Sequence, residues 1–170
     1  MGFPMAKNIL KSGYKLKAFN RSSSKAKALE EFGAEITITL SELVKDSEII
    51  ITMLTDDEAI DKVMGSLNFL DNLKSGSIVI DMSSIKPITA KKHEKNLSFK
   101  KIKYLDAPVS GGTIGAEEGS LAIMIGGEKK VFKEVEDLLK TMGNPTLVGP
   151  VGSGQVSKLA NQIIVGLTIG

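Results

Sequence analysis

Hydrophobic positions along the chain alternate between short runs typical of strands and longer amphipathic stretches typical of helices. Glu48–Leu54 is almost continuously apolar, which indicates a strand buried on both faces of a parallel sheet. The expected strands are Tyr14–Phe19, Glu35–Thr39, Glu48–Leu54, Ser77–Met82, Lys103–Asp106, Gly119–Ile125 and Pro145–Val148. The expected helices are Pro4–Lys11, Ser24–Phe32, Glu42–Asp46, Asp57–Met64, Pro87–Lys95, Glu128–Met142 and a final helix from Gly154 onward.

This order of segments predicts an α/β fold with a doubly wound, mainly parallel sheet, because parallel strands need helical crossovers between them. The chain begins at the start of a helix, with no strand before it, and ends within an apolar helix at Gly170. An apolar helix at the end of a molecule would leave a large exposed patch. We therefore expect a fragment of a longer protein, in which a further domain or subunit covers that helix.

The composition narrows the function without identifying it. Of the 170 residues, 42% are hydrophobic and 25% are charged, an ordinary globular mixture. The net charge of +2 is too small, and the lysines too scattered, to indicate nucleic-acid binding. There is no cysteine and one histidine, so we expect no metal site. With no membrane-length apolar run and no signal peptide, we expect a cytoplasmic protein.

One lysine interrupts the apolar helix near the C-terminus. Lys158, Asn161 and Gln162 are spaced i, i+3 and i+4, so they project from one helical face. The lysine either extends its ammonium group into water or is a desolvated ammonium that donates a proton. Spacing alone favours the first interpretation, because lone charges near apolar faces usually reach solvent.

Two other polar segments have competing interpretations. Ser110, Gly111 and Gly112 can present successive backbone N–H groups and a hydroxyl to a substrate carboxylate, although a glycine pair also marks ordinary turns. We expect Asp56–Glu58 to cap a helix and complement its dipole rather than bind a metal. His93 lies between charged residues on a polar helix, so we expect it to be solvated and not catalytic.

Three motifs in this order resemble the β-hydroxyacid dehydrogenase family. The first is Met1-Gly-Phe-Pro-Met-Ala6, which is similar to the end of that family's opening G-x-G-x-M-G-x-P-M-A. The second is Asp106-Ala-Pro-Val-Ser-Gly-Gly112, followed by Gly115-Ala and Gly119-Ser-Leu. The third is Gly152-Ser-Gly-Gln-Val-Ser-Lys-Leu-Ala-Asn-Gln162. The resemblance covers essentially the whole chain, and the last two motifs at this separation are specific.

The resemblance implies a Rossmann-type NAD(P)-binding domain over residues 1–150, lacking its first strand, and the start of an all-helical domain over residues 151–170. In the family a strand precedes Met1 and lies in the middle of the sheet. Without it, Tyr14–Phe19 and Glu48–Leu54 should remain unpaired with each other, and the chain alone should bind cofactor poorly. The missing helical domain is expected to form a homo-oligomer.

The resemblance also assigns roles to individual residues. Lys158 is implied to be the general acid/base in a hydride transfer between a nicotinamide and a small substrate. The substrate carries a carboxylate, and its implied ligands are Ser110, Gly111, Gly112 and Asn161. The implied cofactor-binding residues are Gly2, Asn20, Arg21, Ser22, Met53, Leu54, Thr55, Ala59 and Ser84.

Individual residues also favour one cofactor and one substrate among those the family uses. No acid follows the predicted strand Tyr14–Phe19 to bind a ribose hydroxyl, whereas Arg21 and nearby hydroxyls suit a 2′-phosphate, so NADP(H) is preferred and NAD(H) is possible. Gln162, where many relatives have a second asparagine, points to the branch that reduces 2-hydroxy-3-oxopropionate. Other candidates are 3-hydroxyisobutyrate, glyoxylate and succinic semialdehyde. A non-catalytic NADP-binding module is the alternative class, but such relatives lack the lysine.

Overall fold

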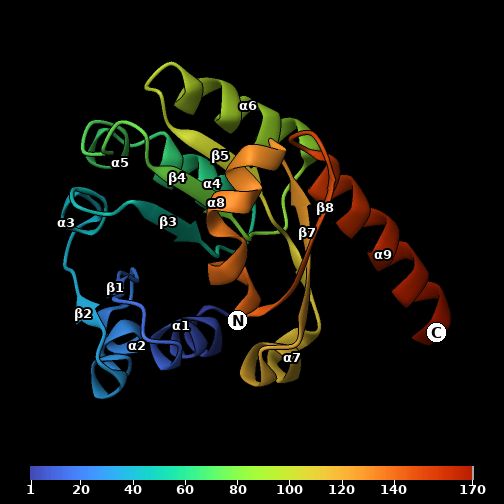
Figure 1. The fold of residues 1–170 in the computed structure, drawn as a ribbon, viewed down its shortest axis with the longest axis horizontal. Helices are drawn as coiled ribbons and strands as arrows, with labels where there is room; N and C mark the ends of the chain where they lie inside the picture. Colours follow the sequence, from blue (N-terminus) through green and yellow to red (C-terminus); the bar gives the residue numbers. More distant parts are fainter. Residues whose placement is uncertain (170) are drawn as a thin grey trace.

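The computed structural model describes residues 1–169, and helices alternate with strands through most of that length (Figure 1). The strands are β1 (Lys17–Ala18), β2 (Glu35–Ile36), β3 (Ile49–Thr52), β4 (Ile78–Asp81), β5 (Lys103–Asp106), β6 (Val109–Ser110), β7 (Leu121–Gly126) and β8 (Gly143–Gly149). The helices are α1 (Gly2–Lys11), α2 (Ser23–Lys27), a 3₁₀ turn (Glu30–Phe32), α3 (Leu40–Val44), α4 (Asp57–Met64), α5 (Leu67–Leu70), α6 (Pro87–Ser98), α7 (Gly112–Glu118), α8 (Lys129–Lys140) and α9 (Ser153–Ile169).

The larger sheet has six strands, and most of its pairings are parallel, as the sequence predicted. Strands β3, β4 and β5 run parallel, β7 pairs antiparallel with β5 and β6, and β8 returns parallel to β7. In this register Thr52, Asp81 and Asp106 stand side by side at the carboxyl ends of three neighbouring strands. Ligands of open α/β sheets bind at this edge.

Helices cover both faces of the six-stranded sheet. Along β4, Ile78 and Ile80 contact one core, which α1 and α8 complete, while Val79 contacts the other core, which α3 to α6 complete. This alternation follows from the pleat, which points successive side chains to opposite faces. In the predicted amphipathic helix Glu128–Met142, apolar residues recur every three or four positions, which predicts one inward-facing side. This is confirmed on α8, where the buried residues are Val131, Phe132, Val135, Leu138 and Leu139.

The first two strands stand apart from this sheet. Strand β1 pairs only with β2, and within residues 1–169 neither of them pairs with β3 (Figure 1). This confirms the expectation that Tyr14–Phe19 and Glu48–Leu54 do not form a ladder with each other. Each strand is only two residues long, shorter than the predicted Tyr14–Phe19 and Glu35–Thr39, because the ladder has a partner on one side only.

Several local predictions need correction. Ser41 comes directly before the predicted helix Glu42–Asp46, so its residue type predicts that it is the N-cap. The N-cap of α3 is instead Thr39: its hydroxyl accepts a hydrogen bond from Glu42 N, and the Glu42 carboxylate reaches back in a capping box. Asp56 is confirmed as the N-cap of α4. The short elements α5, β6 and α7 were not predicted, because segments of two to seven residues show no clear periodicity.

At the C-terminal end, α9 extends to Ile169, and the predicted continuation to Gly170 lies outside the described residues. None of the helices in the part of the chain that the structure describes has the length and apolar character needed to cross a membrane.

Candidate active site

A buried carboxylate organises the carboxyl ends of β3 and β4. Asp81 Oδ1 accepts hydrogen bonds from Thr52 Oγ1 at 2.9 Å and Ser83 N at 3.0 Å, and Oδ2 accepts one from Tyr104 Oη at 3.3 Å. Burial raises the pKa of Asp81, and these donors oppose that shift. Ser83 Oγ accepts a further bond from Leu54 N at 2.9 Å, so the segments that follow both strands are held together.

The first helix begins beside this edge. A Cβ added at Gly2 would lie 3.9 Å from Met53 Cβ, so the start of α1 is close to the end of β3. Thr55 Oγ1 donates to Asp56 Oδ2 at 2.8 Å, and Asp56 Oδ1 accepts from Ala59 N at 2.8 Å. The predicted cofactor residues of this segment therefore lie along one edge, with α1 and α4 both starting there.

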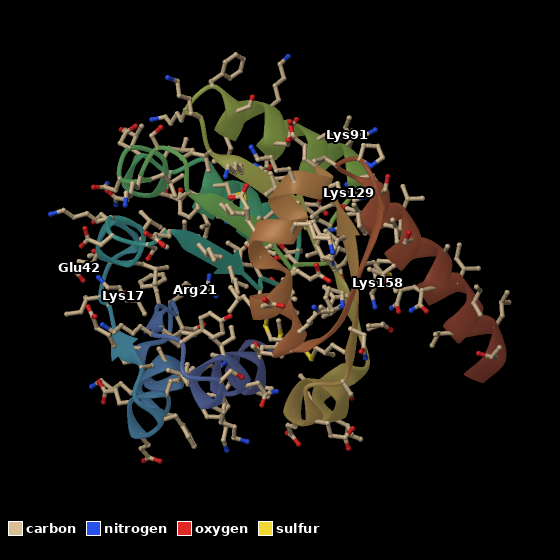
Figure 2. The ribbon with its side chains drawn as sticks, viewed as in Figure 1. Lys17, Arg21, Glu42, Lys91, Lys129 and Lys158 are labelled. Atoms are coloured by element: carbon tan, nitrogen blue, oxygen red, sulfur yellow. The ribbon has the colours of Figure 1, made fainter. Side chains whose placement is uncertain are left out.

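The segment after β1 is exposed. Asn20, Arg21 and Ser22 all face solvent, and Asn20 Nδ2 donates to Ser22 O at 2.9 Å, which shapes the turn into α2. Within residues 1–169, no carboxylate lies within ion-pair distance of Arg21. Figure 2 shows Arg21 near the two-stranded sheet and Lys158 near α9, so the two predicted ends of the site lie well apart.

Lys158 borders an open pocket of about 270 Å³ between α9 and the segment after β4. The pocket is lined in part by Asp57, Ser84, Ile85, Gln155, Lys158 and Gln162. Partial burial lowers the pKa of the Lys158 ammonium from its ordinary value. Its Nζ donates to Gln162 Oε1 at 3.0 Å, so the amide one turn later holds the ammonium. The lysine is half-buried, and its head group is held at the pocket by a polar partner.

The predicted substrate residues meet next to α9. Asn161 Nδ2 donates to Ser110 Oγ at 3.0 Å, which joins α9 to the end of β6. Gly111 and Gly112 have φ angles of 133° and 64°, which L side chains rarely adopt, and both are exposed. Gly112 begins α7, so the predicted loop is the short connection between β6 and that helix.

The structure therefore brings together only some of the residues predicted to bind cofactor or substrate or to act in catalysis. Lys158 and Ser84 line one pocket, and Asn161 is bonded to Ser110. Leu54 is joined to the segment after β4 through Ser83.

Three polar residues at the site were given no definite role from the sequence. Gln162 was noted only as a subfamily feature, although its i+4 spacing from Lys158 indicates the contact. Gln155 lies three residues before Lys158, and this i, i+3 spacing likewise places the two side chains on one helical face. Asp57 was interpreted only as a helix-capping charge, but its Oδ1 accepts from Lys86 N at 3.1 Å and Thr89 Oγ1 at 2.5 Å. Those partners lie far along the chain, so the sequence gives no signal for them.

The prediction that His93 is solvated was wrong. The residue is 3% exposed, and its Nε2 lies 2.8 Å from Asp61 Oδ1. The polar helix on which it lies, α6, packs one face against β5, and His93 belongs to that face with Leu97. Burial lowers the pKa of the imidazole, although the nearby Asp61 carboxylate opposes the shift. Among residues 1–169, no three His, Asp or Glu side chains gather in a way that could hold a metal ion.

These features define a Rossmann-type α/β domain with a polar site along the carboxyl edge of its sheet. Residues 1–154 match the family described as the NAD binding domain of 6-phosphogluconate dehydrogenase, and the chain belongs to this family.

Relatives with known names agree with this assignment. The chain is 41% identical over 171 residues to 2-hydroxy-3-oxopropionate reductase of Escherichia coli (strain K12), covering 99% of this chain and 58% of that protein. Mycobacterium tuberculosis 3-hydroxyisobutyrate dehydrogenase, solved with L-serine, has a TM-score of 0.93 at 27% identity, covering 97% of this chain and 56% of that one. Psf3, solved with NADP+ and 2-OPP, has a TM-score of 0.91 at 27% identity, covering 95% and 58% respectively. The chain spans little more than half the length of each.

Proposed function

We propose that this chain is the nucleotide-binding part of an NADP(H)-dependent oxidoreductase that interconverts a small semialdehyde and a 3-hydroxy acid. The proposed substrate is 2-hydroxy-3-oxopropionate. One observation carries the proposal: a half-buried lysine with a lowered pKa borders a pocket at the carboxyl edge of the sheet, beside a hydroxyl–amide pair that can bind a carboxylate.

The residues present fit a dinucleotide phosphate. Helix α1 has ten residues, no acidic residue in its first turn and no side chain capping its first N–H groups, so those donors suit a diphosphate. Arg21 is exposed next to the hydroxyls of Ser22 and Ser23, which suits a 2′-phosphate. Asn20, Met53, Leu54, Thr55, Ala59 and Ser84 would line the rest of the cofactor.

Lys158 then acts on the substrate oxygen. The bound nicotinamide supplies or accepts the hydride at the substrate carbon. In the reductive direction Lys158 donates its proton to the carbonyl oxygen, where negative charge develops. Its lowered pKa makes the ammonium a better acid near neutral pH and makes the neutral amine accessible for the reverse reaction. Gln162 holds the ammonium toward the pocket.

The other end of the substrate binds between α9 and the start of α7. Ser110 Oγ and Asn161 Nδ2 are already hydrogen-bonded to each other, and each retains a further donor or acceptor position. Gly111 and Gly112 are exposed residues, and their backbone N–H groups would add donors for a carboxylate. Fixing the carboxylate here would direct the aldehyde toward Lys158.

We also propose that α9 leads into a second, helical domain through which the protein forms a homo-oligomer. Several large apolar side chains of α9 are more than half exposed, which supports burial against further helices. They are Val156, Leu159, Ile163, Ile164 and Leu167.

The experiment is a turnover assay of the full-length protein with four aldehydes and both cofactors. The aldehydes are 2-hydroxy-3-oxopropionate, the semialdehyde of 3-hydroxyisobutyrate, glyoxylate and succinic semialdehyde. We expect the highest kcat/KM with the first, and at least about a tenfold preference for NADPH over NADH, because Arg21 makes a charge-assisted contact. Arg21→Ala should reduce that preference to about threefold or less.

Lys11→Ala is the matched control, because it removes a positive charge from the far end of α1. It should leave the cofactor preference unchanged. No turnover with any aldehyde would contradict the enzyme assignment and favour a non-catalytic NADP-binding module. An Arg21→Ala variant that keeps the NADPH preference would contradict the role given to this residue.

A further inference from the structure

The first turn of α9 is held by a side chain from a different part of the chain. Asp106, at the end of β5, is fully buried. Its Oδ1 accepts a hydrogen bond from Gly152 N at 2.7 Å, and its Oδ2 accepts one from Gln155 N at 2.9 Å. The first N–H groups of a helix have no partner within the helix, so this carboxylate caps α9 from outside.

Glycines allow the start of α9 to pack very closely against the sheet. A Cβ added at Gly126 would lie 2.3 Å from Asp106 Oδ1, and one added at Gly154 would lie 2.3 Å from Met124 O. The start of α9 therefore lies directly on the backbone of the sheet, without side chains between them. Close-packed backbone contacts of this kind allow little sliding or rotation.

The side chain of Gln155 makes a second set of hydrogen bonds, which join α9 to the segment after β4 that borders the pocket. Gln155 is 1% exposed; its Oε1 accepts from Ile85 N at 3.1 Å, and its Nε2 donates to Ser83 O at 2.8 Å. Ser84, between those two residues, lines the same pocket as Lys158. The segment after β4 and the first turn of α9 are thus fixed to each other on the pocket side.

Lys158 lies three residues beyond Gln155, so its position follows from the position of that first turn. From these contacts we infer that Asp106, assisted by Gln155, is a positioning residue: it fixes the start of α9 so that the Lys158 ammonium meets the pocket at the correct place. This inference rests on the proposed role of Lys158 in proton transfer. It adds that the orientation of the lysine depends on a carboxylate that does not touch the substrate.

The test compares variants of the full-length enzyme by pH profiles of kcat and by NADPH Kd. Asp106→Asn places an amide NH₂ against a backbone N–H and so breaks one of the two bonds. We expect kcat to fall by about a hundredfold, because a displacement of about 1 Å can have that effect. The apparent pKa of the lysine in the kcat profile should also shift, while NADPH Kd changes by less than about threefold.

Phe69→Leu is the matched control. Phe69 is 1% exposed on α5, it belongs to the core that α3 to α6 complete, and it takes no part in the hydrogen bonds of Asp106 or Gln155. It should lower the melting temperature without shifting the pKa in the kcat profile. If Asp106→Asn does not fold, Gln155→Met replaces it, since it removes both side-chain bonds at similar volume, and the same loss of kcat and shift of the profile are expected.

Two outcomes separate this inference from the proposed function. If Lys158→Ala is inactive but folded Asp106→Asn and Gln155→Met keep the wild-type kcat and pH profile, the positioning role is wrong and the proposed function stands. If Lys158→Ala keeps near wild-type turnover, the proposed function is wrong and this inference is overturned with it. Loss of activity only in proportion to the unfolded fraction would also overturn the positioning role.

Discussion

The two ends of the candidate site rest on regions that are built very differently. The region around Arg21 is supported by β1 and β2, which have two residues each, and none of these four residues is fully buried. The region around Lys158 is supported by the six-stranded sheet, in which all four residues of β4 are buried. Figure 1 shows the two-stranded sheet, in blue, set apart from the larger sheet.

The attachment of the first region to the second is also limited. Helix α1 contributes Met5 and Ile9 to the main core, and Asn8 Nδ2 donates to Ala116 O on α7 at 2.8 Å. Strands β1 and β2 have no such connection to the larger sheet among residues 1–169. The comparison indicates that the region around Lys158 is held firmly by the fold, whereas the region around Arg21 has little support from the larger sheet.

Hydrogen exchange should show the largest difference between the two regions. Amides of β4 should exchange only through global unfolding, because they lie between two strands and two cores. Amides of β1 and β2 should open locally at a cost lower by at least about 3 kcal/mol, so they should exchange more than a hundredfold faster. The measurement is native-state amide exchange followed by mass spectrometry or NMR. Equal protection in β1 and β4 would remove the basis of the comparison.

A smaller, pH-dependent effect should be confined to the second region. The pKa of His93 is lowered from 6.5 by burial, so between its folded pKa and 6.5 the unfolded state binds more protons than the folded state. Stability should therefore rise with pH through that window and fall on acidification. His93→Gln should flatten this part of the profile, as measured by urea unfolding between about pH 5 and 7.

Asp61→Asn provides the matching variant. It removes the carboxylate that opposes the shift of the His93 pKa, so it should make the acid sensitivity steeper. Exchange in β1 and β2 should not respond to either substitution, because His93 and Asp61 lie on α6 and α4. An unchanged pH profile in His93→Gln would show that the imidazole is protonated equally in both states.

The larger elements could be predicted from the sequence because their periodicity is long and regular. Helix α8 and its inward residues were predicted correctly, as were the bounds of β5. The position of the candidate site at the carboxyl ends of the strands could also be predicted, because parallel strands end at the same edge of a sheet. His93 was misplaced because the solvent-facing residues beside it dominate the pattern, whereas its own burial depends on the packing of α6.

The candidate site was less predictable, because its key contacts join residues far apart in sequence. The bond from Asn161 to Ser110 spans 51 positions, and the bonds from Asp106 to the start of α9 span 46 and 49. Local spacing gives no signal for such pairs. Motif resemblance predicts roles for Lys158 and Ser110, and these stay predictions, whereas the hydrogen bonds of Asp106 to the start of α9 emerged only from the folded arrangement.

The central claim is that Lys158, on the firmly held side, transfers the proton. The most direct measurement is kcat for Lys158→Ala in the full-length protein, with NADPH Kd measured on the same sample. We predict that kcat falls by about a thousandfold, the usual range for loss of a general acid, while NADPH Kd stays within about threefold. Turnover within tenfold of the wild type, with cofactor binding intact, would contradict the account.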